Sequence, residues 1–276
     1  MPLDQSKTQA AEWWSTDIIQ MSPGVINFHG QPIQNLIGQA GFVEMIWLML
    51  KRDLPSAGQA TLLNAALMAS VDHGPQAPSI AIARMASSCG VGINNAMASA
   101  ANVLGDVHGG AGEQCVSLFR QVITLRDTNG LSLEAAAEEV MAAFFEAGHK
   151  YAPGFGHRFH PVDPRSAPLL ALLDQAEKDG VVAPGYADTA RAVQHVIAAR
   201  KGKLIPLNID GATGAIYGAL QFEPQLCRGL FVLSRSVGIL AHAWEQMQRN
   251  ERNKGPMPKG WLWTYTGKPV QPAQEA

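Results

Sequence analysis

Histidines in glycine-rich loops are the first feature of this sequence that could do chemistry. His157 lies in the loop PGFGHRFHPVDPR (153–165), directly after Gly154 and Gly156 and before Arg158. Glycine allows positive φ or a close approach to a ligand, and proline restricts φ and disfavours helix around it. Such a stiff loop could hold imidazoles and guanidiniums near a small anionic substrate, or it could be a solvated turn.

A second histidine, an aspartate and an arginine extend the set. His108 is the centre of the loop GDVHGGAGE (105–113), and Asp210 precedes a glycine in NIDGATG. Arg235 interrupts the apolar run LFVLSRSVGILAHAWEQ, where a charge is costly unless it is paired, so we expect it to meet an anion or a structural partner. His73 ends a predicted helix, where a cation is favoured, so a capping role is open. The remaining histidines outside these loops are interpreted as core or surface residues: His29, His149, His195 and His242.

Several other chemistries find no support in the sequence. His157 and His160 could be a metal pair, but no matching ligand set follows them, so no metal is expected. The chain lacks a P-loop, a dinucleotide-binding glycine fingerprint after a strand, and a Gly-x-Ser-x-Gly elbow. No face of interleaved basic and aromatic residues indicates nucleic acid binding.

Composition bounds the class of protein. The chain has 276 residues, 47% hydrophobic and 16% charged, with a net charge of -2. This length allows one large domain or two smaller ones, and the charge gives no bias toward nucleic acid or anionic membranes. Three widely spaced cysteines fit no disulfide or zinc framework and favour a cytoplasmic location. The N-terminus MPLDQSKTQAAEWW is not typical of a signal peptide.

Hydrophobic periodicity predicts a mainly α fold, with one short hairpin within residues 13–33. The charge-free run 85–105 contains Ser, Asn and Gly throughout, so we interpret it as buried helix and not as a membrane span. Ser56 is a plausible N-cap. The helices are predicted near 42–52, 56–73, 79–105, 114–127, 132–150, 166–180, 187–200, from Gly211 onward, and 224–252.

The chain resembles the citrate synthase superfamily at these same residues. The stretches VDHGP, GDVHGGAGE, PGFGHR…DPR, NIDGATG and SRSVGILAH occur in the family's order. Within the superfamily, the closing segment RSVGILAHAWEQMQRNERNKG is most similar to citryl-CoA lyase and to the C-terminal citryl-CoA lyase module of ATP-citrate lyase.

The resemblance implies three catalytic residues. His108 is similar to the histidine that hydrogen-bonds the thioester carbonyl and stabilises its enol or enolate. Asp210 is similar to the carboxylate that exchanges the α-proton of acetyl-CoA. His157 is similar to the histidine that polarises the oxaloacetate ketone, or takes the proton of the tertiary hydroxyl of citryl-CoA in the cleavage direction.

The resemblance also implies the binding residues and the partners. The substrates expected are a CoA thioester and a dicarboxylate or tricarboxylate, with no tightly bound cofactor, no nucleic acid and no membrane. The expected assembly is a homodimer or a dimer of dimers. His73, Arg165 and Arg235 are expected to hold substrate carboxylates, and Arg158 is placed with them without a defined role. The residues expected to bind CoA are Lys201, Lys203, Gly154 and Gly156.

Family structures imply a large helical domain of residues 1–111 and 216–276 and a smaller helical domain of residues 112–215. Closure between two such domains would exclude water from the reacting groups. These boundaries come from the resemblance and not from any composition shift in the sequence.

Two departures from the synthase pattern favour a lyase that cleaves citryl-CoA to acetyl-CoA and oxaloacetate. Gly112 takes the place where synthases commonly have Asn, and the tail GPMPKGWLWTYTG lacks the arginine that synthases donate to the partner subunit. Citrate synthase, or a lyase for a citramalyl-type thioester, remains an alternative. A non-catalytic acyl-CoA-binding subunit is a third hypothesis, but a pure binder does not need the proton-transfer set of His108, His157 and Asp210. The direction of the reaction stays open.

Overall fold

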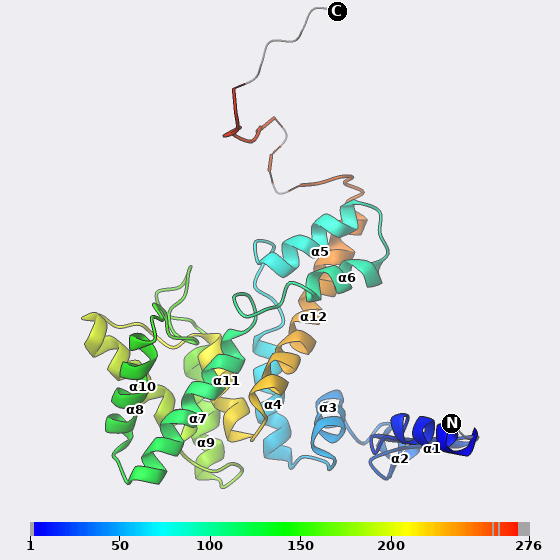
Figure 1. Ribbon diagram of the computed structural model, residues 1–276, viewed down its shortest axis with the longest axis horizontal. Helices are drawn as coiled ribbons and strands as arrows, with labels where there is room; N and C mark the ends of the chain where they lie inside the picture. Colours follow the sequence, from blue (N-terminus) through cyan, green and yellow to red (C-terminus); the bar gives the residue numbers. More distant parts are fainter. Residues whose placement is uncertain (1–2, 256, 259, 270–276) are drawn as a thin grey trace, which may run out of the picture. The chain divides into compact units, whose positions relative to one another are not determined.

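The protein is mainly helical in the part of the chain that the structure describes. The computed structural model describes residues 3–255, 257–258 and 260–269 (Figure 1). The predicted mainly α fold is confirmed. The helices are α1 (Leu3–Trp13), α2 (Ile33–Leu36), α3 (Phe42–Lys51), α4 (Ala57–Ala69), α5 (Pro78–Ser88), α6 (Ile93–Ala101), α7 (Ala111–Asn129), α8 (Leu133–Glu146), α9 (Ser166–Lys178), α10 (Tyr186–Lys201), α11 (Ile209–Ala219) and α12 (Pro224–Gln248).

The predicted hairpin is present and carries a third short strand. Strand β1 (Ile19–Ser22) pairs antiparallel with β2 (Val25–Phe28), and β2 pairs antiparallel with β3 (Gln31–Pro32). The register places Ser22 opposite Val25, so a two-residue turn joins the first two strands.

Two predicted helix ends are wrong by a few residues, and each error affects a site residue. Helix α4 begins at the predicted N-cap, where Ser56 and Gln59 form a capping box, but it ends at Ala69. His73 therefore follows the helix at a distance and does not cap it. Asp210 was expected to precede its helix, yet it lies in the first turn of α11 because Asn208 is the N-cap.

The charge-free run 85–105 is divided between two short helices. Helix α5 ends at Ser88 and α6 begins at Ile93, with Gly90 at a φ of +84° in the turn between them. Among the described residues, α12 is the one helix long and apolar enough to cross a membrane by length and composition, a test that core helices also meet.

The chain divides into two compact units. The first comprises residues 1–72 and 104–237, and the second comprises residues 73–103 and 238–276. Helix α12 contributes residues to both units. The domain boundaries expected from the resemblance, at 111/112 and 215/216, stay a prediction.

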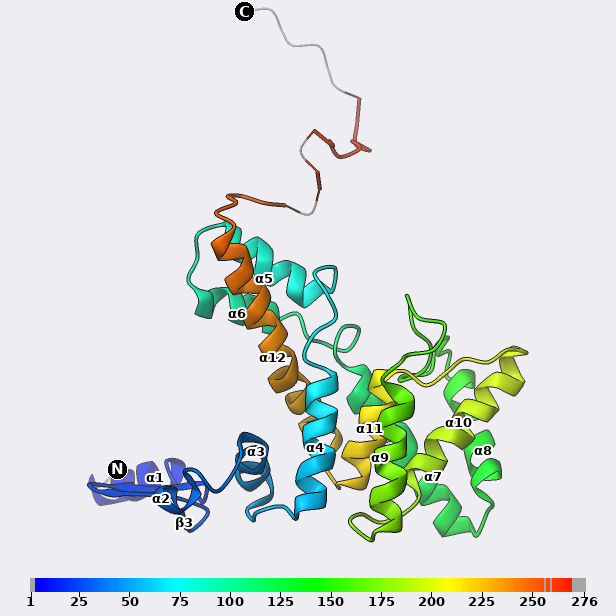
Figure 2. The ribbon, with the colours of Figure 1, turned by 180° about the vertical axis from the view of Figure 1, so that it is seen from behind.

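Helices α7 and α11 form the centre of the first unit (Figure 2). Helix α11 has the sequence IDGATGAIYGA, and its small residues let neighbouring backbones approach closely. A Cβ added at Gly214 would lie 3.2 Å from Cβ of Cys115 on α7, and one added at Gly218 would overlap the ring of Tyr186. Helices α4, α9 and α10 also pack on α11, so it is buried along most of its length.

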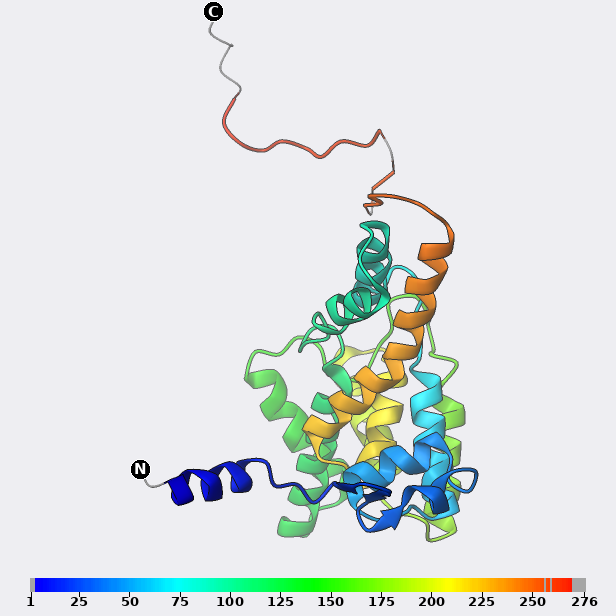
Figure 3. The same cartoon turned by 90° about the vertical axis from the view of Figure 1, so that its right-hand side faces the viewer.

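The second unit is a packing of small-residue helices. Helices α5 and α6 lie side by side (Figure 3). After α12, the backbone N–H of Asn253 donates to the carbonyl of Ser88 and that of Lys254 donates to the Ser88 hydroxyl. Arg84 of α5 forms an ion pair with Glu245 of α12, which connects the two helices.

The start of the loop 153–165 packs tightly against both central helices of the first unit. Gly154 has a φ of +82°, and a Cβ there would lie 2.6 Å from Sγ of Cys115 and 2.7 Å from Cα of Gly211. The backbone of this loop can come so close only because residue 154 has no side chain.

We predict that Gly154→Ala destabilises the protein by at least about 3 kcal/mol, because an overpacking cost adds to the strain of a left-handed residue. Gly130→Ala is the matched control, since Gly130 has a φ of +63° but nothing within 4 Å of an added Cβ. It should cost about 1 kcal/mol, the strain alone. Urea unfolding of both variants checks this, and equal losses would contradict the packing argument.

Candidate active site

His108 is presented by a loop closed on itself just before α7. A single bridge pairs Gly105 with Gly109, and Nε2 of Gln114 donates to the carbonyl of Asp106 at 3.1 Å. A Cβ at Gly110 would lie 2.8 Å from the Asp106 backbone, so the tight turn requires glycine there. His108 is half-buried, and burial together with the charge of Arg235 lowers the pKa of its imidazole. The ring is therefore neutral at neutral pH.

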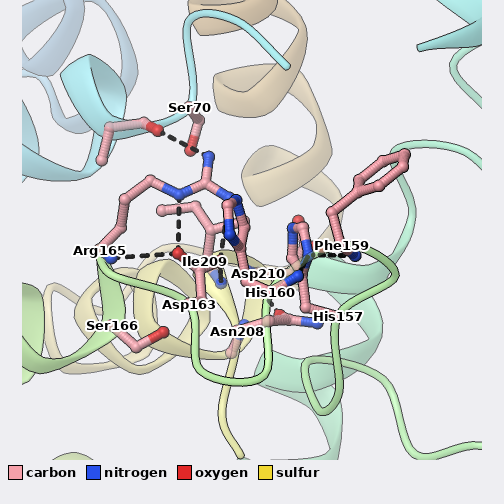
Figure 4. A network of polar contacts seen from close by, with 12 residues as sticks. Ser70, His157, Phe159, His160, Asp163, Arg165, Ser166, Asn208, Ile209 and Asp210 are labelled. Carbon is pink, nitrogen blue, oxygen red and sulfur yellow. Dashed lines mark hydrogen bonds and ion pairs between the residues drawn. The ribbon is translucent and has the colours of Figure 1, made fainter. Parts of the chain in front are cut away.

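The ring of His157 is fixed in one tautomer by its own loop. Its Nδ1 accepts hydrogen bonds from the backbone N–H groups of Phe159 and His160, both at 3.0 Å (Figure 4). A nitrogen that accepts has no proton, so the neutral ring carries its proton on Nε2. Burial lowers the pKa of His157 and the charges of His160 and Arg165 add to this, while Asp163 raises it.

Asp210 is positioned by the N-cap of α11. The side chain of Asn208 accepts from the N–H groups of Asp210 and Gly211, and its Nδ2 donates to the carbonyl of Gly156 at 2.6 Å. One amide therefore joins the helix that carries Asp210 to the loop that carries His157. Burial raises the pKa of the Asp210 carboxyl, although Arg235 and Arg165 oppose the shift.

The carboxylate of Asp163 connects Arg165 with the first residue of α11. Oδ1 accepts from the backbone N–H of Arg165 at 3.0 Å and from its Nε at 2.9 Å. Oδ2 accepts from Nη2 of Arg165 at 2.9 Å and from the N–H of Ile209 at 3.0 Å (Figure 4). The Asp163 side chain has no exposed surface. Burial opposes its charge, but the hydrogen bonds from Arg165 outweigh burial and lower the pKa to about 2.

This pairing limits how Arg165 can bind a substrate. Its Nε and Nη2 already face Asp163, and Nη1 makes only a long contact, 3.4 Å, to the carbonyl of Ala69. A carboxylate of the substrate would have to meet the edge formed by Nη1 and Nη2.

Arg235 lies within α12, directly after Ser234. It is 5% exposed, its Nε donates to the carbonyl of Ser70 at 3.2 Å, and its guanidinium carbon lies 4.8 Å from the centroid of the Phe231 ring. Burial lowers the pKa of Arg235, and the charges of Asp210 and Asp72 oppose this. The predicted buried charge is therefore real, and the charges that stabilise it include the candidate catalytic carboxylate.

Arg165 and Arg235 place the predicted catalytic residues in one electrostatic environment. The charge of Arg235 acts on His108 and Asp210, and the charge of Arg165 acts on Asp210 and His157. The arrangement joins two neutral imidazoles and one carboxyl with a raised pKa to two cations. It could bind an anionic substrate and move protons at a carbon next to a carbonyl group.

The roles of the other predicted site residues stay predictions. His73 is the first residue of the second unit. Arg158 and Lys203 are exposed, and Gly156 has a φ of +79°. Lys201 and Arg200, at the end of α10, lie with their charges 5.3 Å and 5.1 Å from the centroid of the Phe145 ring. Among the described residues, no cluster of three or more His, Cys, Asp or Glu could hold a metal ion.

Three residues that organise the site had no assigned role in the sequence. Asp163 and Asn208 belong to the motifs DPR and NIDG, and a polar residue two positions before the functional one was the available signal. Arg228 forms ion pairs with Asp106 and Glu113 on either side of His108. Its signal was a second arginine seven residues before Arg235 in an apolar helix.

Most of the chain matches one known protein family. Residues 55–257 match the family described as citrate synthase, C-terminal domain. The chain belongs to the citrate synthase family. Its residues 108, 157 and 210 all lie within the matched range.

Curated relatives in the citrate synthase family are longer than this chain. The chain is 29% identical over 252 residues to the probable ATP-citrate synthase subunit 1 of Neurospora crassa, covering 79% of this chain and 33% of that protein. It is 27% identical over 221 residues to the citrate synthase of Haloferax volcanii, covering 80% of this chain and 54% of that protein. The chain thus spans about a third to a half of the length of these relatives.

Solved structures give a closer match in length. The structure of citryl-CoA lyase from Hydrogenobacter thermophilus superposes with a TM-score of 0.80 at 28% identity, covering 95% of this chain and 97% of that chain. ATP citrate lyase from Methanothrix soehngenii, in complex with citrate and coenzyme A, has a TM-score of 0.76 at 22% identity and is covered to 45% of its length. At that identity the second likeness shows the fold.

We predict that Asp163→Asn destabilises the protein by about 3 kcal/mol at neutral pH, because it leaves Arg165 without its buried partner. The pKa of Asp163 is lowered from 3.8 to about 2, so its contribution is fully present above pH 3.8 and is lost as the pH falls through 2. The stability difference should therefore narrow over that window in urea unfolding experiments.

The control for this variant is Asp174→Asn. Asp174 also receives two hydrogen bonds from one arginine, Arg191, but both side chains are partly exposed. Its loss should be below about 1 kcal/mol. A loss for Asp163→Asn no larger than this would contradict the role of Asp163 as a buried connection.

Proposed function

We propose that this enzyme cleaves citryl-CoA to acetyl-CoA and oxaloacetate. The observation that carries the proposal is the likeness to citryl-CoA lyase from Hydrogenobacter thermophilus over nearly the whole of both chains. The chain covers only 54% of the Haloferax volcanii citrate synthase. The tail after α12, which lacks the arginine expected of a synthase, supports the same assignment.

Cleavage leaves two electrons on the carbon next to the thioester, and His108 is placed to stabilise the resulting enolate oxygen. The carbon–carbon bond breaks as the tertiary hydroxyl of the citryl group releases its proton to water and becomes the ketone of oxaloacetate. An imidazole with a lowered pKa stays neutral and can donate one hydrogen bond to the thioester oxygen. One such positioned donor is typically worth about 3 kcal/mol.

His157 acts at the oxygen that is a hydroxyl in citryl-CoA and a ketone in oxaloacetate. Its ring proton is on Nε2 because Nδ1 accepts two backbone hydrogen bonds. Taking the hydroxyl proton would need a ring lone pair that is already engaged. The geometry therefore supports the role of hydrogen-bond donor to this oxygen over the role of proton acceptor.

Asp210 transfers the proton at the α-carbon of acetyl-CoA. In cleavage, the carboxylic acid form protonates the enolate carbon, and in the reverse direction the carboxylate removes the same proton. A carboxyl with a raised pKa is a better match to either step at neutral pH than an ordinary aspartate.

Substrate binding is assigned to charges around these groups. Arg165, through its Nη1 and Nη2 edge, and Arg235 bind carboxylates of the citryl group, together with His73. Lys201 and Lys203, with Gly154 and Gly156, contact the CoA moiety. CoA enters as part of the substrate, and no tightly bound cofactor is required for these steps.

Citrate synthase activity is the second candidate, favoured by the curated relative from Haloferax volcanii. It would use the same three catalytic residues in the direction of condensation, followed by hydrolysis of the thioester. A citramalyl-type thioester is an alternative substrate for the lyase direction.

We also propose a homodimer or dimer of dimers in the cytoplasm. The apolar residues Leu233, Val237, Leu240 and Trp244 recur at spacings of four, three and four on α12, and each is at least 43% exposed. A continuous apolar helix face is suited to packing on another chain. The exposed free thiol of Cys89 fits a reducing compartment. Light scattering on the purified protein measures the assembly, and a monomer would contradict it.

We predict that the purified protein forms oxaloacetate from citryl-CoA, followed as NADH consumption by added malate dehydrogenase. The parallel reaction supplies acetyl-CoA and oxaloacetate and measures free thiol and citrate. Release of citrate from citryl-CoA with no oxaloacetate would contradict the lyase assignment and favour the synthase.

We predict that Asp210→Asn lowers turnover roughly 10²–10⁴-fold, the usual contribution of a placed acid or base. It should also abolish exchange of the acetyl-CoA methyl protons with deuterated water, measured by mass spectrometry. The exchange by the unchanged enzyme should decline as the pH falls through the pKa of Asp210, which lies above 3.8, because only the carboxylate can accept the proton.

Asp174→Asn is the control for this experiment, since Asp174 lies on α9 and pairs with Arg191 at the surface. Full exchange by Asp210→Asn would remove Asp210 from the mechanism.

A further inference from the structure

The loop that presents His108 is rich in glycine and needs external support. Residues 105, 109, 110 and 112 are all glycine, and Gly109 has a φ of +107°. Glycine gains much conformational freedom when it is released from a fold, so such a loop is not rigid by itself. The contacts within it include the Gly105–Gly109 bridge and two hydrogen bonds from Gln114, one from its side chain to the carbonyl of Asp106 and one from its backbone N–H to the carbonyl of Gly110.

A guanidinium on α12 contacts Asp106 of the loop before His108 and Glu113 in the first turn of α7 after it. Nη2 of Arg228 lies 2.5 Å from Oδ1 of Asp106, two residues before His108. Nε of Arg228 lies 2.5 Å from Oε2 of Glu113, five residues after His108, an ion pair that lacks hydrogen-bond alignment. The two carboxylates are therefore drawn toward one point on a helix.

The same helix carries Arg235, and the spacing of the two arginines is two turns. Residues seven apart lie on the same face of an α-helix. Arg235 is buried beside Ser70 and influences His108 and Asp210, while Arg228 holds the ends of the His108 loop. One face of α12 thus carries both Arg235, a candidate ligand for a substrate carboxylate, and Arg228, which contacts the loop.

We propose that Arg228 is a positioning residue for His108. It fixes the glycine-rich loop through Asp106 and Glu113, so that the imidazole meets the thioester oxygen as charge develops there. The inference rests on the proposed function, because it assigns a purpose to the orientation of His108. Arg228 itself touches no reacting atom.

The expected cost falls on turnover and not on binding of the substrate. Removal of an interaction that matters only as the enolate forms lowers kcat and kcat/KM equally and leaves KM unchanged. Asp106 is 77% exposed, but Glu113 and Arg228 are 21% and 28% exposed, so water screens the contact with Glu113 less. A small misplacement of a catalytic group can lower the rate of the reaction by up to about 10²-fold.

Arg228→Gln tests the proposal in the full-length enzyme. We expect kcat for citryl-CoA cleavage to fall about tenfold or more with KM retained. Arg228→Lys keeps one charge and should recover part of the loss, as should millimolar guanidinium added to Arg228→Ala. Arg191→Gln is the matched control, because Arg191 also binds two carboxylates, Asp174 and Asp188, away from the site; its kcat should equal that of the unchanged enzyme.

A second measurement does not depend on the substrate. Hydrogen exchange of the unliganded protein should show faster exchange for the peptide 104–113 in Arg228→Gln, and unchanged exchange for 209–219. If the unchanged enzyme fails to cleave citryl-CoA, the proposed function is wrong. Faster exchange of 104–113 in Arg228→Gln would still support the role of Arg228 in holding the loop. Unchanged exchange in this peptide, or a kcat equal to that of Arg191→Gln, overturns the positioning role.

Discussion

The carboxylate of Asp163 is the contact on which the rest of the site depends. It has no exposed surface, yet it accepts four hydrogen bonds, three from Arg165 and one from the first residue of α11. A buried charge is tolerated only when its lone pairs are satisfied in this way. The same oxygens therefore fix the orientation of a candidate carboxylate ligand and the entry of the helix that carries Asp210. Neither could shift without leaving a polar group of the other unpaired.

A steric constraint acts together with this electrostatic one. Gly154 and Gly214 both lie against Cys115, and Gly154 also lies against Gly211, so the His157 loop, α11 and α7 meet at backbone distance. The amide of Asn208 then bonds to the loop and to the helix at their closest approach. Because α7 also follows the His108 loop directly, the three catalytic segments share one packing centre. A single added methyl group at this point would move them together.

The sequence was sufficient for most of the helices, and its motifs gave candidate residues for the chemistry, but it did not indicate the partners of those residues. Periodicity and capping residues such as Ser56 define helices locally, and the glycine-rich motifs marked His108 and His157. The end of α4 was misplaced because the helix stops at Ala69, and the start of α11 because Asn208 caps the helix from two residues before Asp210. Residue spacing along α12 suggested a buried charge at Arg235, but nothing local to Arg228 indicated that its carboxylates lie more than a hundred residues earlier. Contacts of that range are set by packing, which a motif does not encode.

The shifts in pKa at the site have a common origin and opposite consequences. Burial disfavours charge on every group, so it lowers the pKa of His108 and His157 and raises that of Asp210. Two guanidiniums, Arg165 and Arg235, oppose the shift of Asp210 and are candidates to meet an anionic substrate. Burial thereby favours the neutral, hydrogen-bond-donating form of the imidazoles, and it makes the Asp210 carboxyl easier to protonate than an ordinary aspartate. The pKa values of the imidazoles and of the carboxyl therefore move toward each other, because burial favours the neutral form of all three groups. Burial makes these groups costly to place in the fold. The same burial gives two neutral imidazoles that can donate hydrogen bonds and a carboxyl that can carry a proton.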